Sequence, residues 1–219
     1  MIDLKSQLRG LTEQFQKQIP GDVAATMGAA TAALRASGIA DRALRRGQRM
    51  PDFALPDATG QIVDSETLRR SGPLVVVFYR GNWCPYCNLA LKALQERLPA
   101  IKAKGATLVA ISPETPDQSL TTREKNELAF PVLTDGGNRV ARTFGLVFAL
   151  DERLRPIYRS FGVDLAAHNG EASHELPLPA TYVVARDGTV IDAFVEADYR
   201  ERLAPETVLE WLDRVPAAG

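Results

Sequence analysis

The amino-acid sequence predicts an α/β fold in which helices cover both faces of a mixed central sheet, with a helical arm ahead of it. A continuous apolar run at residues 74–79 is typical of a strand buried on both faces, residues 106–112 indicate a second buried strand, and a helical stretch follows each of them. A turn signal at residues 186–188 separates two apolar segments and predicts an antiparallel hairpin. Strands that alternate with helices and end in a hairpin indicate three layers.

The chain divides into a helical arm, residues 1–47, and a domain, residues 48–219. At 219 residues it is long for one domain and short for two, so we expect one compact domain with an attachment. The apolar face of such an arm usually packs on its own domain, and covering a second subunit in a homodimer is the alternative. The first expected helix of the arm spans residues 2–18 and is ended by Pro20-Gly21. A second helix is capped by Asp22 and runs to about Arg35, and a third spans residues 39–46.

Elements of the domain follow from apolar periodicity and from turn residues. The longest helix is expected directly after the first buried strand, with leucines on its buried side. The expected order is an extended segment at 51–57, a strand at 61–63, a helix at 65–70 capped by Asp64 or Ser65, a strand at 74–79, a helix at 88–104, a strand at 106–112, a helix at 115–126, a strand at 131–134, a helix at 138–144, strands at 179–185 and 189–196, and a helix at 205–215.

Charge and composition exclude several classes of partner. The formal net charge is -1, with 26 basic and 27 acidic residues, which gives no electrostatic reason to expect nucleic acid or an anionic membrane. No apolar run approaches the roughly 20 residues that span a bilayer, and the N-terminus lacks the apolar stretch of a secretory signal. We therefore expect a cytoplasmic protein. Two Cys and two His could form a zinc site only if a distant loop folded onto the cysteines, so no metal is expected.

Both cysteines of the chain lie in one motif, Cys84-Pro85-Tyr86-Cys87, between the first buried strand and the longest helix. At a helix N-terminus, unpaired N–H groups and the helix dipole stabilise a thiolate, which is the reactive form of cysteine. A second cysteine one turn later can resolve a mixed disulfide. Pro85 suits the first helical turn, and Trp83 is expected to shield one side. The alternative is that the two cysteines are merely small buried hydrophobic residues.

Several ordered motifs resemble the peroxiredoxin-like proteins of the alkyl hydroperoxide reductase and thiol-specific antioxidant family. The resemblance runs from Met50 to about Leu212 and leaves the arm uncovered. It implies a thioredoxin-like three-layer α/β/α sandwich and a thiol-based antioxidant oxidoreductase. The matching segments are Pro51-Asp52-Phe53-Ala54-Leu55-Pro56-Asp57, Val77 to Cys87, Ala110-Ile111-Ser112, Phe130 to Asp135 and Pro179 to Val184.

The sequence departs from the peroxiredoxin pattern at the motif itself. Peroxiredoxins carry Pro-x-x-x-Thr-x-x-Cys after this strand; laid on Phe78-Tyr79 without gaps, these positions hold Arg80, Cys84 and Cys87. Peroxiredoxins also place an arginine before a later strand, where it helps to polarise the peroxide, and here that residue is Pro179. Thioredoxins have a cis-proline at that position. The buried acid of thioredoxins is absent, because Phe78 takes its place. The Cys-x-x-Cys and Pro179 therefore resemble thioredoxins, whereas the surrounding motifs resemble peroxiredoxins.

Two mechanisms follow from the resemblance, and they assign the cysteines in opposite orders. In the peroxidase mechanism, placed first, Cys87 attacks the O–O bond and becomes a sulfenic acid. Cys84 then condenses with it, and thioredoxin or a low-molecular-weight thiol reopens the disulfide. Arg80 would supply positive charge near the peroxide. In the disulfide-exchange mechanism, Cys84 is the exposed nucleophile and Cys87, tucked under the helix, resolves. Neither mechanism needs a cofactor.

A third interpretation is non-enzymatic: an interaction module whose arm docks a partner and whose cysteines form a redox-sensitive switch. Other polar residues have ordinary structural roles in our interpretation. His168 and His174 lie in a polar segment that is expected to be a solvated loop. Glu114 and Thr115 follow the second buried strand, at the sheet edge where ligands bind in such folds, but helix capping is the preferred role.

Overall fold

The computed structural model describes residues 3–216 of the chain. Its helices are α1 (Leu4–Gln18), α2 (Gly21–Ala36), η1 (Ile39–Arg42), α3 (Ser65–Ser71), α4 (Pro85–Ala103), α5 (Pro116–Lys125), η2 (Gly136–Asn138), α6 (Arg139–Thr143), α7 (Leu154–Ser160), α8 (Leu165–Asn169) and α9 (Pro205–Leu212). Its strands are β1 (Ala54–Pro56), β2 (Ile62–Asp64), β3 (Leu74–Phe78), β4 (Thr107–Ser112), β5 (Val132–Thr134), β6 (Val147–Ala149), β7 (Glu175–Pro177), β8 (Ala180–Val184) and β9 (Val190–Val195).

The central sheet is mixed, as predicted, with the strand order β5-β4-β3-β8-β9. β3 pairs in parallel with β4 and antiparallel with β8, so that Val76 lies opposite Val109 on one side and Tyr182 on the other. β8 and β9 form the predicted antiparallel hairpin. The motif of interest therefore follows the middle strand of the sheet.

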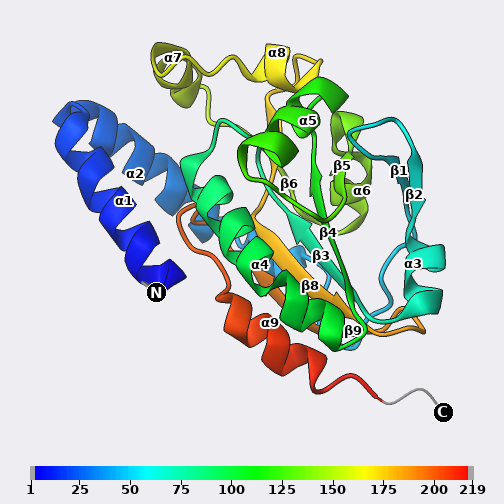
Figure 1. Cartoon of the computed structure of the whole chain (residues 1–219). Coiled ribbons are helices and arrows are strands. Elements are labelled where there is room, and N and C mark those ends of the chain that lie inside the picture. Colours follow the sequence, from blue (N-terminus) through cyan, green and yellow to red (C-terminus); the bar gives the residue numbers. More distant parts are fainter. Residues whose placement is uncertain (1–2, 217–219) are drawn as a thin grey trace.

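Side chains of β3 alternate between two hydrophobic cores, one on each face of the sheet. One core gathers Val75 and Val77 with residues of α1, α4 and α9, and the other gathers Leu74, Val76 and Phe78 with residues of η1 and with Phe144 next to α6. Because both faces are covered, the strand is apolar at every position rather than at every second one. The three-layer α/β/α sandwich predicted from the sequence is confirmed (Figure 1).

The arm packs on the domain of the same chain, as expected for its apolar face. α1 and α2 lie side by side next to the start of α4 (Figure 1). Leu4 and Leu8 are buried in the core that α4 shares, and Phe15 meets Phe161 edge to face with ring centroids 5.5 Å apart. Met27 of α2 packs in a third cluster with residues of α7 and β7. The apolar face of the arm is thus covered within one chain.

Some local predictions were wrong. α2 begins at Gly21, so Asp22 lies in its first turn and does not cap it, and the expected third helix of the arm is only the short η1. α4 begins at Pro85, three residues earlier than predicted. β6, α7, α8 and β7 were not predicted, and the segment expected to be a loop begins inside α8. These elements have three to seven residues, which is too short for periodicity to reveal.

Within residues 3–216, no helix combines the length and the apolar character that a bilayer crossing requires.

Candidate active site

The cysteine motif lies where the central strand passes into the longest helix. β3 ends at Phe78, and Cys84 is the N-cap of α4, with an extended backbone at φ -90° and ψ 108°. Pro85 occupies the first turn, as predicted, where its missing N–H leaves no donor unpaired. The Cys84 carbonyl accepts hydrogen bonds from the N–H groups of Cys87 at 3.0 Å and Asn88 at 3.1 Å. Cys84 therefore lies at the positive end of the α4 dipole, and Cys87 lies one turn inside.

Both thiols are buried, and the prediction that Cys84 is exposed was wrong. Cys84 is 0% exposed and Cys87 is 1% exposed, and both cysteines are free. The thiols are buried by aromatic side chains whose position was not predicted from the sequence. The ring of Tyr199 packs on Arg80, and Trp83 packs on Tyr158 with centroids 5.6 Å apart. The shielding role expected of Trp83 is thus shared with rings from distant segments.

Arg80 is a buried cation, 4% exposed, beside the first sulfur. Its Nη2 lies 3.7 Å from Cys84 Sγ, and its Nη1 donates to Tyr158 Oη at 3.2 Å. Its Cζ lies 4.3 Å from the ring centroid of Tyr199, 4.8 Å from that of Trp83 and 5.9 Å from that of Tyr158. Although burial favours the neutral form, interactions with Tyr158 and Cys84 raise the pKa of Arg80, so the guanidinium stays charged.

The pKa of the Cys84 thiol lies well below its ordinary value. Burial alone would raise this pKa, but the hydrogen bond from the Cys87 thiol and the charges of Arg80 and Arg202 outweigh burial. The nearby backbone N–H of Cys87, at the positive end of α4, acts in the same direction. Burial, the hydrogen bond donated to Cys84 and the negative charge of Cys84 raise the pKa of Cys87 well above its ordinary value. Ionisation of the pair is therefore favoured at Cys84 and disfavoured at Cys87.

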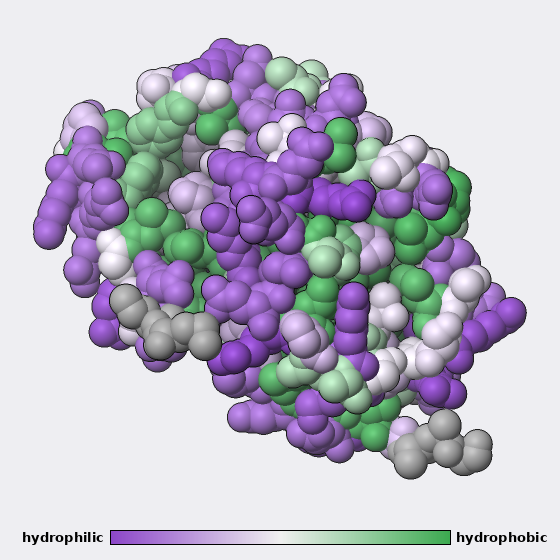
Figure 2. Space-filling model, viewed as in Figure 1, coloured by the Kyte–Doolittle hydropathy of each residue, from purple (hydrophilic) through white to green (hydrophobic). Residues whose placement is uncertain are grey.

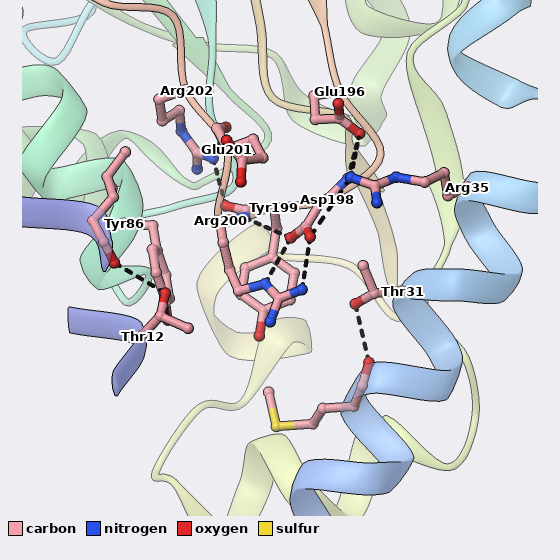
Figure 3. Close-up of polar contacts among 12 residues, drawn as sticks. Thr12, Thr31, Arg35, Tyr86, Glu196, Asp198, Tyr199, Arg200, Glu201 and Arg202 are labelled. Carbon is pink, nitrogen blue, oxygen red and sulfur yellow. Dashed lines mark hydrogen bonds and ion pairs between the residues drawn. The ribbon is translucent and has the colours of Figure 1, made fainter. Parts of the chain in front are cut away.

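A second arginine contacts the second sulfur. Nη2 of Arg202, from the loop between β9 and α9, lies 3.1 Å from Cys87 Sγ. Its Nη1 donates to the backbone carbonyls of Tyr199 and Glu201 (Figure 3). The ring of Tyr199 also meets Tyr86 of the motif edge to face, with centroids 5.5 Å apart. The two sulfurs therefore have separate cationic neighbours, each from a different part of the chain.

The loop between β3 and α4 depends on a glycine and on a buried acid. Gly81 has φ +152°, and a Cβ at this position would lie 2.2 Å from Trp83 Nε1 and 2.9 Å from Glu114 Oε1. Glu114 is fully buried and accepts a hydrogen bond from the Asn82 N–H at 2.9 Å. The preferred role of helix capping was therefore wrong for the Glu114 side chain, and Thr115 caps α5 only by position, without a side-chain hydrogen bond.

Pro179 precedes β8 and is buried. Every peptide bond between the described residues is trans, so Pro179 differs from the cis-proline of thioredoxins. Its carbonyl accepts a hydrogen bond from the Glu196 N–H at 3.2 Å, which extends the β8–β9 hairpin. The residue does share a cavity wall with Arg80.

Two cavities meet at the Arg80 side of the motif. The larger, about 320 Å³, runs between α2 and the segment 148–158 and is lined by Arg80, Tyr158, Pro179 and Tyr199 among others. The smaller, about 130 Å³, is lined by Phe15 and Met27 of the arm together with the neighbours of Cys84, namely Arg80, Trp83, Pro85 and Tyr86. Figure 2 shows hydrophobic residues gathered between the arm and the body of the molecule on this side.

The sequence did not point to Tyr158, Tyr199 or Arg202. Tyr158 lies in α7, which was not predicted, and the other two lie in the irregular segment after β9. The run Tyr199-Arg200-Glu201-Arg202 was an available signal, because two arginines and a tyrosine follow a few residues after the predicted hairpin. Neither histidine joins the motif: His168 Nδ1 lies 3.6 Å from Glu114 Oε1. Among the described residues, no group of three or more His, Cys, Asp or Glu could hold a metal ion.

Comparisons with known proteins agree with this architecture. Thiol-disulfide oxidoreductase ResA of Bacillus thuringiensis subsp. konkukian is 23% identical over 158 residues, which cover 72% of this chain and 73% of that protein. Chloroplastic peroxiredoxin Q of Gentiana triflora is 28% identical over 161 residues, covering 74% of this chain and 61% of that protein.

Solved structures and the family comparison lead to the assignment. The crystal structure of peroxidoxin BcpB from Mycobacterium tuberculosis has a TM-score of 0.62 at 21% identity and covers 80% of this chain and 99% of that one, so the fold is shared. Residues 46–193 match the model of the AhpC/TSA family. With a buried Cys84–Cys87 pair at the head of α4, this chain is a thiol-based oxidoreductase and belongs to the AhpC/TSA family.

Proposed function

We propose that the protein reduces peroxides, with Cys84 as the attacking thiolate and Cys87 as the resolving thiol. The observation that carries this proposal is the asymmetry of the pair: Cys84 accepts hydrogen bonds at the head of α4 beside the buried Arg80, whereas Cys87 donates one. The thiolate is the nucleophilic form of cysteine. This order is the reverse of the peroxidase mechanism expected from the sequence.

The proposed cycle has two chemical steps. The Cys84 thiolate attacks the terminal oxygen of ROOH, the O–O bond breaks, and Cys84 becomes a sulfenic acid that keeps the hydroperoxide proton, while the departing alkoxide takes up a proton from solvent to give ROH. Cys87 then attacks that sulfur, water leaves, and a Cys84–Cys87 disulfide remains. Arg80 would stabilise first the thiolate and then the negative charge on the departing oxygen, because its guanidinium already faces Cys84 Sγ.

Burial favours a peroxide over a protein disulfide as the oxidant. Neither sulfur is exposed, and the cavity beside Cys84 holds about 130 Å³. A hydroperoxide group fits such a space, whereas an extended peptide with its disulfide does not. We propose that Trp83 and Pro85 shape this entry from either side of Cys84, and that Pro179 forms part of its larger neighbour. Likeness to peroxiredoxin Q supports the same choice.

Disulfide exchange is the second candidate, and specific observations favour it. A Cys-x-x-Cys with its first cysteine at a helix N-cap suits attack on a disulfide, and the chain resembles a protein named thiol-disulfide oxidoreductase ResA. Cys84 is the nucleophile in this mechanism too. The two candidates therefore differ in the oxidant and agree on the order of the cysteines. A redox-sensitive interaction module would instead show slow oxidation with no turnover.

Stopped-flow oxidation of three reduced proteins distinguishes these functions: wild type, Cys84→Ser and Cys87→Ser, each mixed with hydrogen peroxide, tert-butyl hydroperoxide or hydroxyethyl disulfide. We expect Cys84→Ser to lose the fast peroxide reaction. Cys87→Ser should react once at close to the wild-type rate and stop as a sulfenic acid, which dimedone traps. A fast peroxide reaction that survives in Cys84→Ser and disappears in Cys87→Ser would restore the order expected from the sequence. Fast reaction with the disulfide alone would establish exchange.

The reductant and the assembly complete the proposal. A thioredoxin-type protein or a low-molecular-weight thiol would reopen the disulfide. A homodimer stays a prediction that sedimentation checks, and the packing of Leu4 and Leu8 inside the chain gives it no support. The boundary between an arm of residues 1–47 and a domain of residues 48–219 is likewise a proposal, supported by a family match that begins at residue 46.

A further inference from the structure

A groove of about 440 Å³ lies on the other side of the motif, between α1 and the loop after β9. It is lined by four basic and two acidic side chains, together with apolar residues of α1. We call it the basic groove. Its charged residues are Lys5, Arg9, Arg200, Arg202, Asp198 and Glu201.

Positive charge in the basic groove is not balanced by its acids. Asp198 is occupied by Arg200, whose Nε and Nη2 donate to its two oxygens at 2.8 Å and 2.7 Å (Figure 3). Lys5 and Arg9 stand on the exposed face of α1, with Glu201 as the other acid of the lining. The whole chain has a net charge of -1, so any attraction for an anion is local to this groove.

Arg202 joins the basic groove to the second sulfur. It lines the groove, and its Nη2 lies 3.1 Å from Cys87 Sγ. Neither of the two cavities near Arg80 includes Arg202, so Cys84 and Cys87 are approached from different sides. A small anionic molecule in the groove could pair with the Arg202 guanidinium and draw it away from Cys87. The rest of that molecule would then lie beside the Cys87 sulfur.

The chemistry of the oxidised motif favours attack at Cys87. In thiol–disulfide exchange, the better-stabilised thiolate is the better leaving group. Attack at the Cys87 sulfur expels Cys84, which Arg80 and the head of α4 stabilise as a thiolate. Attack at Cys84 would instead expel Cys87 from a site inside the helix. Arg202 of the basic groove thus contacts the sulfur whose attack has the better leaving group.

We propose that the basic groove binds a small thiol that carries a carboxylate and directs its sulfur to Cys87 of the Cys84–Cys87 disulfide. This inference rests on the proposed dithiol cycle. The bound thiolate RS⁻ forms an RS–Cys87 bond while the Cys84–Cys87 bond breaks and the electron pair leaves with Cys84. A second RS⁻ then attacks the sulfur of the bound thiol, RSSR departs, and Cys87 takes up a proton. Two thiols are oxidised and one protein disulfide is reduced.

The shape of the site favours a small molecule over a protein reductant. Pockets of about 300–1,000 Å³ are typical of small-molecule sites, and this groove falls in that range. One of its walls is α1, which also packs on α4 through Leu4 and Leu8. A protein surface would have to displace the arm before it reached Cys87, whereas a small thiol would have to displace only the Arg202 guanidinium.

The test uses full-length protein whose disulfide is formed with diamide, so that it does not depend on the peroxide reaction. Three probe thiols of different charge are compared: 3-mercaptopropionate, 2-mercaptoethanol and cysteamine. Disulfide reduction is followed by quenching with an alkylating agent and mass spectrometry, and each rate is divided by the concentration of thiolate. In the wild type we expect 3-mercaptopropionate to react about tenfold faster than cysteamine, and this preference should shrink at high salt.

Charge reversal on one wall locates the preference. Lys5→Glu/Arg9→Glu should slow 3-mercaptopropionate about tenfold and change the rate of 2-mercaptoethanol less than twofold. The single variants Lys5→Glu and Lys17→Glu form the matched pair, because they make the same charge change on α1 and only Lys5 lines the groove. Lys5→Gln/Arg9→Gln should give an intermediate rate and guards against misfolding of the reversed variant.

The outcomes separate the inference from the function on which it rests. Equal thiolate-normalised rates for the three probes in the wild type would overturn the inference, as would equal effects of Lys5→Glu and of Lys17→Glu. Rapid reduction by a thioredoxin together with negligible reduction by all three thiols would overturn it as well. A disulfide that never forms with diamide would instead remove the dithiol cycle itself.

Discussion

Each side of the cysteine pair has an arginine, but the two sides differ in how deeply that arginine is buried and in the polarity of the cavity beside it. On the Cys84 side, Arg80 is buried among three aromatic rings and faces apolar cavities. On the Cys87 side, Arg202 is only partly buried and lines a polar groove with further charges. The Cys84 side is suited to hold a thiolate out of water. The Cys87 side is suited to bind an anionic small molecule through Arg202.

This difference shows how two chemically identical side chains come to have unequal roles. The position at the head of α4 selects Cys84 as the ionised partner, and burial makes a second negative charge unfavourable, so Cys87 stays protonated. A dithiol in which one member is ionised and the other is a hydrogen-bond donor is prepared for oxidation at the first and resolution by the second.

The largest effect is expected from removal of the buried charge. In the wild type, the lowered pKa of Cys84 keeps it ionised below the ordinary thiol range, so oxidation by peroxide should stay fast at pH 6. Arg80→Gln raises that pKa, because the charge facing the sulfur is lost, and the thiolate fraction at pH 6 falls. We expect the rate at pH 6 to drop between about tenfold and a hundredfold and to recover at higher pH, as stopped-flow pH profiles would show.

Arg202→Gln supplies the matched comparison, since it removes the same charge from the other side. Its pH profile should shift less than that of Arg80→Gln, because Arg202 contacts Cys87 rather than Cys84. Arg80→Lys keeps a charge and should recover part of the lost rate. If Arg202→Gln moved the profile further than Arg80→Gln, the assignment of the two sides would be inverted.

A smaller effect, on stability, is expected at the glycine that shapes the Cys84 side. Gly81→Ala should lower the free energy of unfolding by about 2 kcal/mol, since the new Cβ meets Trp83 and the positive φ is unfavourable for alanine. Denaturant titration measures this loss, and tryptophan fluorescence should report a moved Trp83. Gly105→Ala is the control, because its φ is also positive, at +72°, but nothing lies within 4 Å of the added Cβ. An equal loss of unfolding free energy in the two variants would mean that the Trp83 side chain moves aside at no measurable cost.

The smallest effect concerns the contact between the arm and the motif. The Thr12 hydroxyl bonds both the Leu8 carbonyl and Tyr86 Oη, the latter at 3.2 Å. Thr12→Val should cost about 1 kcal/mol in the free energy of unfolding, as the partly buried hydrogen bond to Tyr86 is lost. Thr26→Val is the matched control, because the exposed Thr26 hydroxyl donates in the same way to the carbonyl of Asp22, four residues earlier in its own helix. A cost no greater than that of Thr26→Val would show that the hydroxyl pair does not anchor the arm.

The sequence was sufficient to predict the sheet and the place of the motif. The apolar run of β3 and the proline after Cys84 are local signals, and local signals are what periodicity and capping rules detect. The cover over the thiols was not predictable in this way. Tyr158, Tyr199 and Arg202 reach the cysteines from 71 to 118 positions away only through the packing of α7 and of the loop after β9. Exposure of Cys84 was therefore misjudged, because exposure depends on those distant side chains.

The central claim, that Cys84 is the thiolate of the pair, is tested most directly by labelling the reduced wild-type protein. Limiting iodoacetamide is added at pH 6, and peptide mapping by mass spectrometry locates the first alkyl group. Both thiols are equally buried, so ionisation rather than exposure decides which one reacts. We predict that Cys84 carries the label; labelling of Cys87 in its place would contradict the account.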